Sequence, residues 1–194
     1  SWAPGELKKL VESPYAELIP ASEYIQWYNT LPEDLKEEVE KYWGKPPGNI
    51  MVYNGKIVMP RIKFGNIIFL PQPMRGDLSD ESLIYHNTTI PPTHQYLAVY
   101  FWLEKRMDAI VHLGTHGTQE WLPGKEVSLW RYDYPSIMIN TTPVIYPYIM
   151  DNVGEGTQAK RRGNAVIIDH LTPPIMIGGL YGCLLYTSEL PTKA

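Results

Sequence analysis

The main pattern along the chain is an alternation of short apolar runs with longer amphipathic stretches. Residues 93–106 (THQYLAVYFWLEKR) follow two prolines and predict a mostly buried helix. Residues 108–114 (DAIVHLG) predict a short buried strand directly after it. A helix of this kind followed by a buried strand is typical of a layered α/β arrangement.

The same alternation continues toward the carboxyl end. Residues 144–152 and 164–171 predict two more strands, and residues 154–163 (GEGTQAKRRG) predict a helix between them with its glycines at the start. Pro147 makes the first of these strands an edge strand or an irregular one. We therefore predict an α/β fold with a mainly parallel sheet layer and flanking helices.

The first part of the chain is more polar and is interrupted by prolines. Residues 24–44 alternate apolar and charged side chains at helical spacing, and Pro32 followed by two acids predicts a helix start. Asn54-Gly55 lies between two apolar runs and predicts a β-hairpin. Residues 64–73 predict a strand that feeds a loop. A small helical and hairpin region thus precedes the α/β layer.

Composition excludes several classes of function. The 194 residues are 44% apolar, enough for one sizeable core or for one domain with an appendage. A formal net charge of −4 does not indicate a general nucleic-acid binder. No apolar run approaches the roughly 20 residues of a membrane span. A single cysteine, Cys183, excludes an internal disulfide and a cysteine metal site, so we expect a cytoplasmic protein.

Residues 111–125 (VHLGTHGTQEWLPGK) gather the side chains best suited to chemistry. His112 ends a predicted strand, and His116 and Glu120 follow in a glycine-rich turn that leads into a short helix. Ligands of open α/β sheets collect at the carboxyl ends of strands. Two histidines and a carboxylate can hold a divalent metal, and a neutral histidine can accept a proton. The spacing is equally compatible with one core histidine and two solvated side chains.

Cationic side chains supply candidate anion sites. Arg75 follows a predicted strand end, where it either reaches an anionic ligand or pairs with a nearby aspartate. Lys160, Arg161 and Arg162 follow a glycine-rich helix start and suit a polycarboxylate ligand, because arginine binds carboxylate in a bidentate way. The alternative for these three is the solvated face of an ordinary helix.

Two further features, a pair of histidines and a glycine-lysine pair, are weaker candidates. His86 and His94 are each more typical of a capping or packing histidine than of a ligand. Gly124-Lys125 is followed by Glu126 and lacks the earlier glycine of a phosphate-binding loop. If the reaction uses ATP, another chain is expected to hydrolyse it.

Several long motifs together resemble one family. VHLGTHGTQEWLPGK and YPYIMDNVGEGTQAKRRGNAVIIDHLTPP are strongly similar to the CobN-type large subunit of cobaltochelatase, whose wider family includes the H subunit of magnesium chelatase. QPMRGD and YHNTTIPPTHQYLAVYFWL match the same family in the same order, so the resemblance runs from about Gly48 to Pro174. The EWLPGK and GEGTQAKRR forms are closer to the cobalt-type branch than to the magnesium-type branch.

The resemblance also predicts an organisation. Large subunits of this family are far longer, so we expect an internal fragment, with a helical lead-in over residues 1–48 and an α/β core over residues 49–182. Residues 183–194 differ from the helical continuation of the family and are expected to be foreign to it or disordered. Residues 127–143 lack the family's cysteine-proline-acid signature.

The resemblance implies insertion of a divalent metal into a tetrapyrrole in cobalamin biosynthesis, Co²⁺ being expected and Mg²⁺ the alternative. ATP would be hydrolysed on AAA+ partner subunits, with no nucleic acid and no membrane span involved. The ion needs temporary ligands, and the two ring N–H protons need an acceptor. We expect Glu120 as proton acceptor or metal relay, with His112 and His116 as metal-handling partners.

The ring itself calls for cationic groups around its carboxylates and for apolar walls. The candidates for substrate binding are Arg75, His94, Lys125, Lys160, Arg161 and Arg162, and the candidate wall residues are Trp121, Trp130, Tyr146 and Tyr148. Three other functions stay open: a tetrapyrrole carrier without chelation, an anion- or nucleotide-binding domain, and a metal-binding protein built on the two histidines and Glu120.

Overall fold

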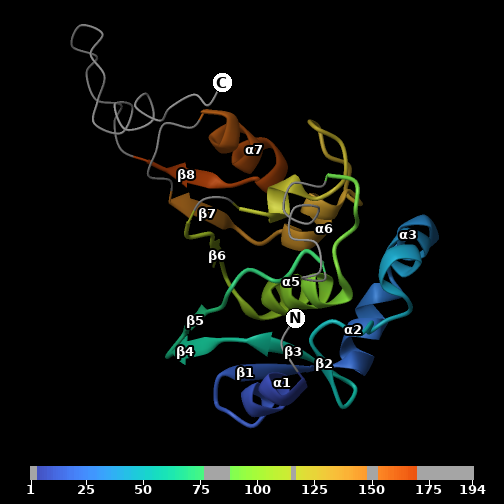
Figure 1. Cartoon of the computed structure of the whole chain (residues 1–194). Coiled ribbons are helices and arrows are strands. Elements are labelled where there is room, and N and C mark those ends of the chain that lie inside the picture. The colour runs from blue at the N-terminus through green and yellow to red at the C-terminus, as the bar shows by residue number, and fades with distance from the viewer. Residues whose placement is uncertain (1–3, 77–87, 115–116, 148–152, 170–194) are drawn as a thin grey trace, which may run out of the picture.

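Figure 1 shows the computed structural model of the chain, which describes residues 4–76, 88–114, 117–147 and 153–169. Helix α5 (His94–Arg106) lies at the centre. An antiparallel sheet packs on one side of α5, and helix α6 (Tyr134–Ile139) and a parallel sheet lie on the other. The fold is the predicted α/β arrangement, and its two layers share α5 as a common core element.

The central position of α5 follows from its sequence. All residues from His94 to Leu103 are buried, as expected for a helix that is apolar around its whole circumference. Thr93 caps the helix, because its hydroxyl accepts from the backbone N–H of Tyr96 at 3.1 Å. Lys105 and Arg106 lie in the last turn, near the negative end of the helix dipole.

The antiparallel layer has the strand order β1-β3-β2, formed by β1 (Ala16–Pro20), β3 (Lys56–Pro60) and β2 (Val52–Tyr53). Asn54 and Gly55 both have positive φ values, 46° and 68°, which confirms the predicted hairpin between β2 and β3. The sequence pattern did not predict β1, which pairs along its whole length with β3. One sheet therefore joins a strand from the expected lead-in segment, residues 1–48, with two strands from the expected α/β core, residues 49–182.

Three helices accompany this layer: α1 (Pro4–Val11), α2 (Ala21–Tyr28) and α3 (Glu33–Trp43). Helix α3 begins directly after Pro32, so the predicted start is confirmed, and it ends before Gly44, which has a φ of 72°. A second hairpin pairs β4 (Ile62–Phe64) with β5 (Ile67–Phe69). The sequence predicted β5 but not its partner.

The parallel sheet has the order β6-β7-β8, formed by β6 (Ile110–Val111), β7 (Val144–Pro147) and β8 (Val166–Ile168). Helix α7 (Val153–Gly163) connects β7 to β8, as predicted. The expectation of an edge strand around Pro147 is wrong, since β7 is the central strand. Proline is tolerated there because Pro147 is the last residue of the strand. No helix in the described ranges is long and apolar enough to cross a bilayer.

Candidate functional site

The predicted turn lies at the carboxyl end of the parallel strands. His112 directly follows β6, and its backbone N–H donates to the carbonyl of Ile145 in β7 at 2.9 Å. The chain passes Gly114, whose φ of 113° favours glycine, and reaches Glu120 in the short 3-10 helix η2 (Gln119–Trp121). The loop leading into a short helix therefore exists as predicted, at the sheet edge where α/β folds collect ligands.

A polar network from α5 reaches this turn. Tyr96 and Tyr100 lie one helical turn apart, with ring centroids 5.1 Å from each other. The amide nitrogen of Gln72 lies 2.6 Å and 2.9 Å from their hydroxyls and 2.8 Å from the hydroxyl of Thr118. Its two hydrogens serve two of these three acceptors at a time. The hydroxyl of Tyr100 lies 3.1 Å from Nε2 of His112, which links α5 to the turn.

His112 is held as a neutral imidazole. Its burial lowers its pKa to about 4, so it carries no charge near neutral pH. The ring packs edge-on between Tyr100 and Tyr146. Nε2 is engaged by Tyr100, and no hydrogen bond from the described residues reaches Nδ1. His112 therefore keeps one ring nitrogen for a ligand or a proton.

Glu120 is 2% exposed and lies close to the tyrosines of this network, whose pKa values its charge affects. Its carboxylate packs so closely on Gly117 that an added Cβ there would lie 2.1 Å from Oε1. Burial is the main cause of the raised pKa values of Tyr96, Tyr100 and Tyr146, and the negative charge of Glu120 adds to it in all three. The carboxylate thus lies among the tyrosines that also surround His112.

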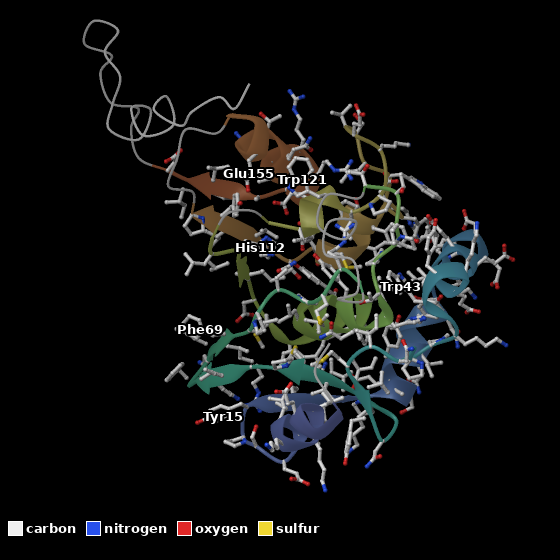
Figure 2. All side chains as sticks on the ribbon, in the orientation of Figure 1. Tyr15, Trp43, Phe69, His112, Trp121 and Glu155 are labelled. Atoms are coloured by element: carbon white, nitrogen blue, oxygen red, sulfur yellow. The ribbon has the colours of Figure 1, made fainter. Side chains whose placement is uncertain are left out.

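A second buried carboxylate belongs to the site. Glu155, in the first turn of α7, is 3% exposed, and the hydroxyl of Tyr146 donates to its Oε1 at 2.6 Å. The same hydroxyl accepts from the backbone N–H of Gly117 at 3.3 Å. Figure 2 labels Glu155 and His112 in the part of the molecule formed by α7 and the parallel strands. Tyr146 therefore connects Glu155 to the turn that carries Glu120.

Arg75 also contacts the backbone of the turn. It is 3% exposed, and its Nη1 donates to the carbonyl of Thr118 at 3.3 Å. Burial lowers the pKa of its guanidinium, which nevertheless stays protonated at neutral pH. The structure thus brings together His112, Glu120 and Arg75, three of the residues singled out by sequence.

Arg162 binds the backbone of the turn and of the residues that follow it. Its Nε donates to the carbonyl of Glu120 at 2.6 Å, and its two terminal nitrogens donate to the carbonyls of Leu122 and Lys125. All three nitrogens of this buried guanidinium therefore contact backbone carbonyls. These contacts favour a role in positioning η2 over the predicted binding of a ligand carboxylate. The side chains of Lys125, Lys160 and Arg161 are exposed.

His94 lies apart from these residues, at the junction of α2, α3 and α5. Its Nε2 lies 2.8 Å from the carbonyl of Gly44, which can only accept, so Nε2 carries the hydrogen. Its Nδ1 then accepts from the hydroxyl of Tyr24 at 2.7 Å. Burial lowers the pKa of His94. Both ring nitrogens are used by the protein, which favours a packing role, and the substrate contact of His94 stays a prediction.

Several predicted residues lie outside the described ranges, namely His86, His116 and Tyr148. Within those ranges, no group of three or more His, Cys, Asp or Glu side chains is placed to hold a metal ion. Of the predicted metal set, the structure describes the positions of His112 and Glu120 but not that of His116, and the metal site as a whole stays a prediction.

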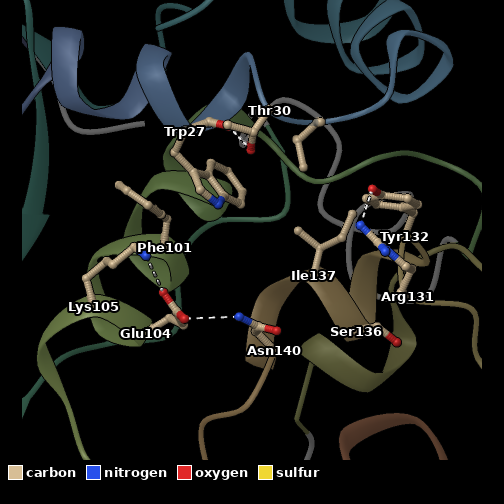
Figure 3. Close-up of a pocket in the computed structure, with 11 residues that line it drawn as sticks. Trp27, Thr30, Phe101, Glu104, Lys105, Arg131, Tyr132, Ser136, Ile137 and Asn140 are labelled. Carbon is tan, nitrogen blue, oxygen red and sulfur yellow. Dashed lines mark hydrogen bonds and ion pairs between the residues drawn. The ribbon is translucent and has the colours of Figure 1, made fainter.

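A cavity of about 400 Å³ lies elsewhere, between α2, α5 and α6 (Figure 3). Trp27 and Phe101 stack on one wall with centroids 4.9 Å apart, and Arg131 packs on Tyr132 at the other. None of the predicted site residues lines it. The geometry of the chemical groups therefore identifies the candidate site, and the cavity does not.

Four residues of the site were not predicted from the sequence: Gln72, Tyr96, Tyr100 and Glu155. Tyr96 and Tyr100 have the i, i+4 spacing of one helix face, which is the signal that could have found them. Gln72 and Glu155 carry no such signal, because only the folded chain brings them to the turn.

Known proteins are similar to this chain over most of its length. A family model described as CobN/Magnesium Chelatase matches residues 2–190. An uncharacterized protein of Methanocaldococcus jannaschii is 47% identical over 169 residues, which is 86% of this chain and 14% of that protein. The aerobic cobaltochelatase subunit CobN of a Sinorhizobium species is 43% identical over 170 residues, which is 87% of this chain and 13% of that subunit.

A solved structure agrees with these relatives. The catalytic subunit of cobaltochelatase from Mycobacterium tuberculosis has a TM-score of 0.73 and 40% sequence identity, over 87% of this chain and 16% of that one. This chain therefore corresponds to a small part of the length of each protein it matches.

Proposed function

Because the chain belongs to the CobN/magnesium chelatase family, we propose that it is part of the large, tetrapyrrole-binding subunit of an ATP-dependent metal chelatase. Co²⁺ is the proposed ion and a cobalamin precursor the proposed ring. The cobaltochelatase relatives and the EWLPGK and GEGTQAKRR motifs support cobalt. A magnesium chelatase H-type subunit is the alternative within the family.

The observation that carries this proposal is the buried carboxylate of Glu120 beside Gly117, close to Tyr100, whose hydroxyl contacts neutral His112. Metal insertion removes two protons from ring nitrogens, and a carboxylate kept from water is a suitable acceptor. Glu120 is the proposed acceptor of the first proton. The network lies at the carboxyl end of β6 and β7, and the ring is proposed to bind against this edge.

His112 is the proposed transient ligand of the incoming ion. A neutral imidazole nitrogen suits Co²⁺, and Nδ1 is the nitrogen not engaged by Tyr100. His116, four residues later, is the proposed second imidazole. The ion is a substrate here, so a weak and incomplete ligand set is an advantage, because the ion must leave it for the ring.

The cations divide into two groups. Lys160 and Arg161 are exposed on α7 and are the proposed partners of the ring's peripheral carboxylates, with Lys125 as a third. Arg75 and Arg162 donate to backbone carbonyls of the turn, and their proposed role is to hold Glu120 in place.

The energy source lies outside this chain. The sequence has no phosphate-binding loop, so AAA+ partner subunits are the proposed site of ATP hydrolysis. The assembled enzyme is proposed to act in the cytoplasm, consistent with the use of a single cysteine.

Glu120→Gln tests the proposal, because it keeps the shape of the side chain and removes its charge. In the complete subunit with its partners, we expect cobalt insertion to fall about 10²-fold or more while the affinity for the ring stays within about threefold. The exposed Glu37→Gln in α3 is the matched control. Insertion at the wild-type rate by Glu120→Gln would contradict the assignment of Glu120, and a ring carrier that never forms product would contradict chelation itself.

A further inference from the structure

Glu155 is a buried carboxylate that the proposed reaction does not yet use. It is 3% exposed and accepts a short hydrogen bond, 2.6 Å, from Tyr146. It lies in the first turn of α7. A buried charge costs free energy that a neutral side chain would not. A carboxylate buried at this cost is a candidate for a chemical role.

Tyr146 joins Glu155 to the rest of the site. Its hydroxyl lies between Oε1 of Glu155 and the backbone N–H of Gly117, on which the carboxylate of Glu120 packs. The two carboxylates therefore reach the same turn, Glu120 directly and Glu155 through one hydroxyl. Both charges raise the pKa of Tyr146, after burial and the hydrogen bond to Glu155 itself.

The stoichiometry of insertion gives both carboxylates a task. A tetrapyrrole gives up two N–H protons to a divalent ion, so one acceptor leaves half of the proton transfer unexplained. We propose that Glu155 accepts the second proton, relayed by the hydroxyl of Tyr146. This inference rests on the proposed function and adds a residue to its proton path.

The transfer balances in atoms and charge. One ring N–H gives its proton to Glu120. The second gives its proton to the oxygen of Tyr146, whose own proton moves to Oε1 of Glu155, so Tyr146 ends as it began. Each ring nitrogen keeps the electron pair of its N–H bond and donates it to the metal. Two carboxylates become carboxylic acids as a doubly charged cation enters the ring, and the summed charge of site, ring and ion is unchanged.

The test compares Glu155→Gln with Tyr146→Phe in the complete subunit with its partners, ring, Co²⁺ and ATP. Glu155→Gln keeps an acceptor for Tyr146 and removes the proton acceptor. Tyr146→Phe keeps the carboxylate and cuts the relay. We expect each to lower the single-turnover insertion rate at least 10-fold, and the double variant to be no slower than the slower single one, because both lie on one path. Ring affinity should stay within threefold.

Glu155→Asp keeps the charge and should insert faster than Glu155→Gln, a rescue that a purely structural role would not give. The exposed Glu37→Gln is the control for charge removal. A wild-type insertion rate for Glu155→Gln, or equal loss in the Asp and Gln variants, would overturn the second-acceptor role while leaving chelation intact. Failure of the wild-type assembly to form any cobalt product would instead overturn the proposed function. If Glu155→Gln does not fold, Tyr146→Phe with wild-type insertion overturns the relay by itself.

Discussion

Two histidines, one buried and one partly buried, lie in two different regions of the molecule. His94, where α2 and α3 meet α5, and His112, at the end of β6, both contact a tyrosine hydroxyl and both have a pKa lowered by burial. They differ in the second nitrogen. His94 donates from Nε2 to the carbonyl of Gly44, whereas Nδ1 of His112 has no partner among the described residues.

The difference teaches which observation separates a packing histidine from a functional one. Burial and a lowered pKa are common to both, so neither property decides. A histidine with both nitrogens used by its own protein has nothing left to offer a ligand. His112 has an unused nitrogen and contacts Tyr100, which lies near the buried carboxylate of Glu120, and this combination makes the region the candidate site.

The largest effect is expected for a substitution at Gly117, which packs against the carboxylate of Glu120. Gly117→Ala places a Cβ 2.1 Å from Oε1, so the carboxylate or the turn must move. Because these atoms are the end of a flexible side chain, the carboxylate can move at little cost in stability, and we expect the loss in the insertion rate, about 10²-fold. Gly156→Ala in α7 is the matched control, because an added Cβ there meets nothing within 4 Å. Thermal unfolding and insertion assays on both variants check this, and a harmless Gly117→Ala would contradict the contact.

Acid should destabilise both regions through their histidines. In the unfolded chain a histidine titrates near 6.5, whereas in the fold the pKa of His112 is about 4. Below pH 6.5 the unfolded state therefore binds the proton first, and stability falls as the pH drops toward 4. His112 contributes about 2 kcal/mol of this loss, discounted for its partial exposure. Urea unfolding between pH 7 and pH 4 should show a shallower decline for His112→Gln, and an unchanged decline would contradict the lowered pKa.

Near neutral pH the two histidines should separate by stability. His94→Gln keeps a donor for Gly44 and loses the acceptor for Tyr24, so we expect a loss of about 1.5 kcal/mol in the free energy of unfolding. His112→Gln keeps a polar atom near Tyr100 and should change that free energy by less than about 0.5 kcal/mol. Equal destabilisation in urea titrations would show that His112 is also a packing residue.

The smallest effect is expected at the exposed end of α7. Replacing Lys160 and Arg161 with alanine removes two solvent-exposed charges and should weaken ring affinity by about 1 kcal/mol, with unfolding unchanged. Absorbance titration with a ring carrying free carboxylates measures this. Arg162→Ala is the contrast, because three backbone carbonyls lose their donor, and it should lower stability more than affinity. If the double substitution leaves the ring affinity unchanged, Lys160 and Arg161 do not bind the ring and belong to the solvated face of α7.

Local signals account for the parts of the fold that were predicted. Asn54-Gly55, the two prolines before α5 and the apolar run of β6 act over a few residues, and each produced the expected element. Strand β1 could not be predicted, because AELIP becomes a strand only through pairing with β3, about 40 residues away in sequence.

The site was predictable only in part for the same reason. His112 and Glu120 were found because they share one glycine-rich segment. Glu155 needs β7 and α7 to bring it to Tyr146, and the lone acid in GEGTQ gives no hint of this. Arg162 looked like its neighbour Arg161, yet successive helical residues point about 100° apart, so one is buried and the other exposed.

The most direct test of the account is a pair of single-turnover rates for cobalt insertion, measured with His112→Gln and His94→Gln in the complete subunit at a temperature where both are folded. His112→Gln loses Nδ1, and we expect it to be at least about 10-fold slower than wild type with ring affinity retained. His94→Gln should stay within about threefold of wild type. Wild-type insertion by His112→Gln, or equal slowing in both variants, would contradict the claim that the unused nitrogen of His112 serves the chemistry.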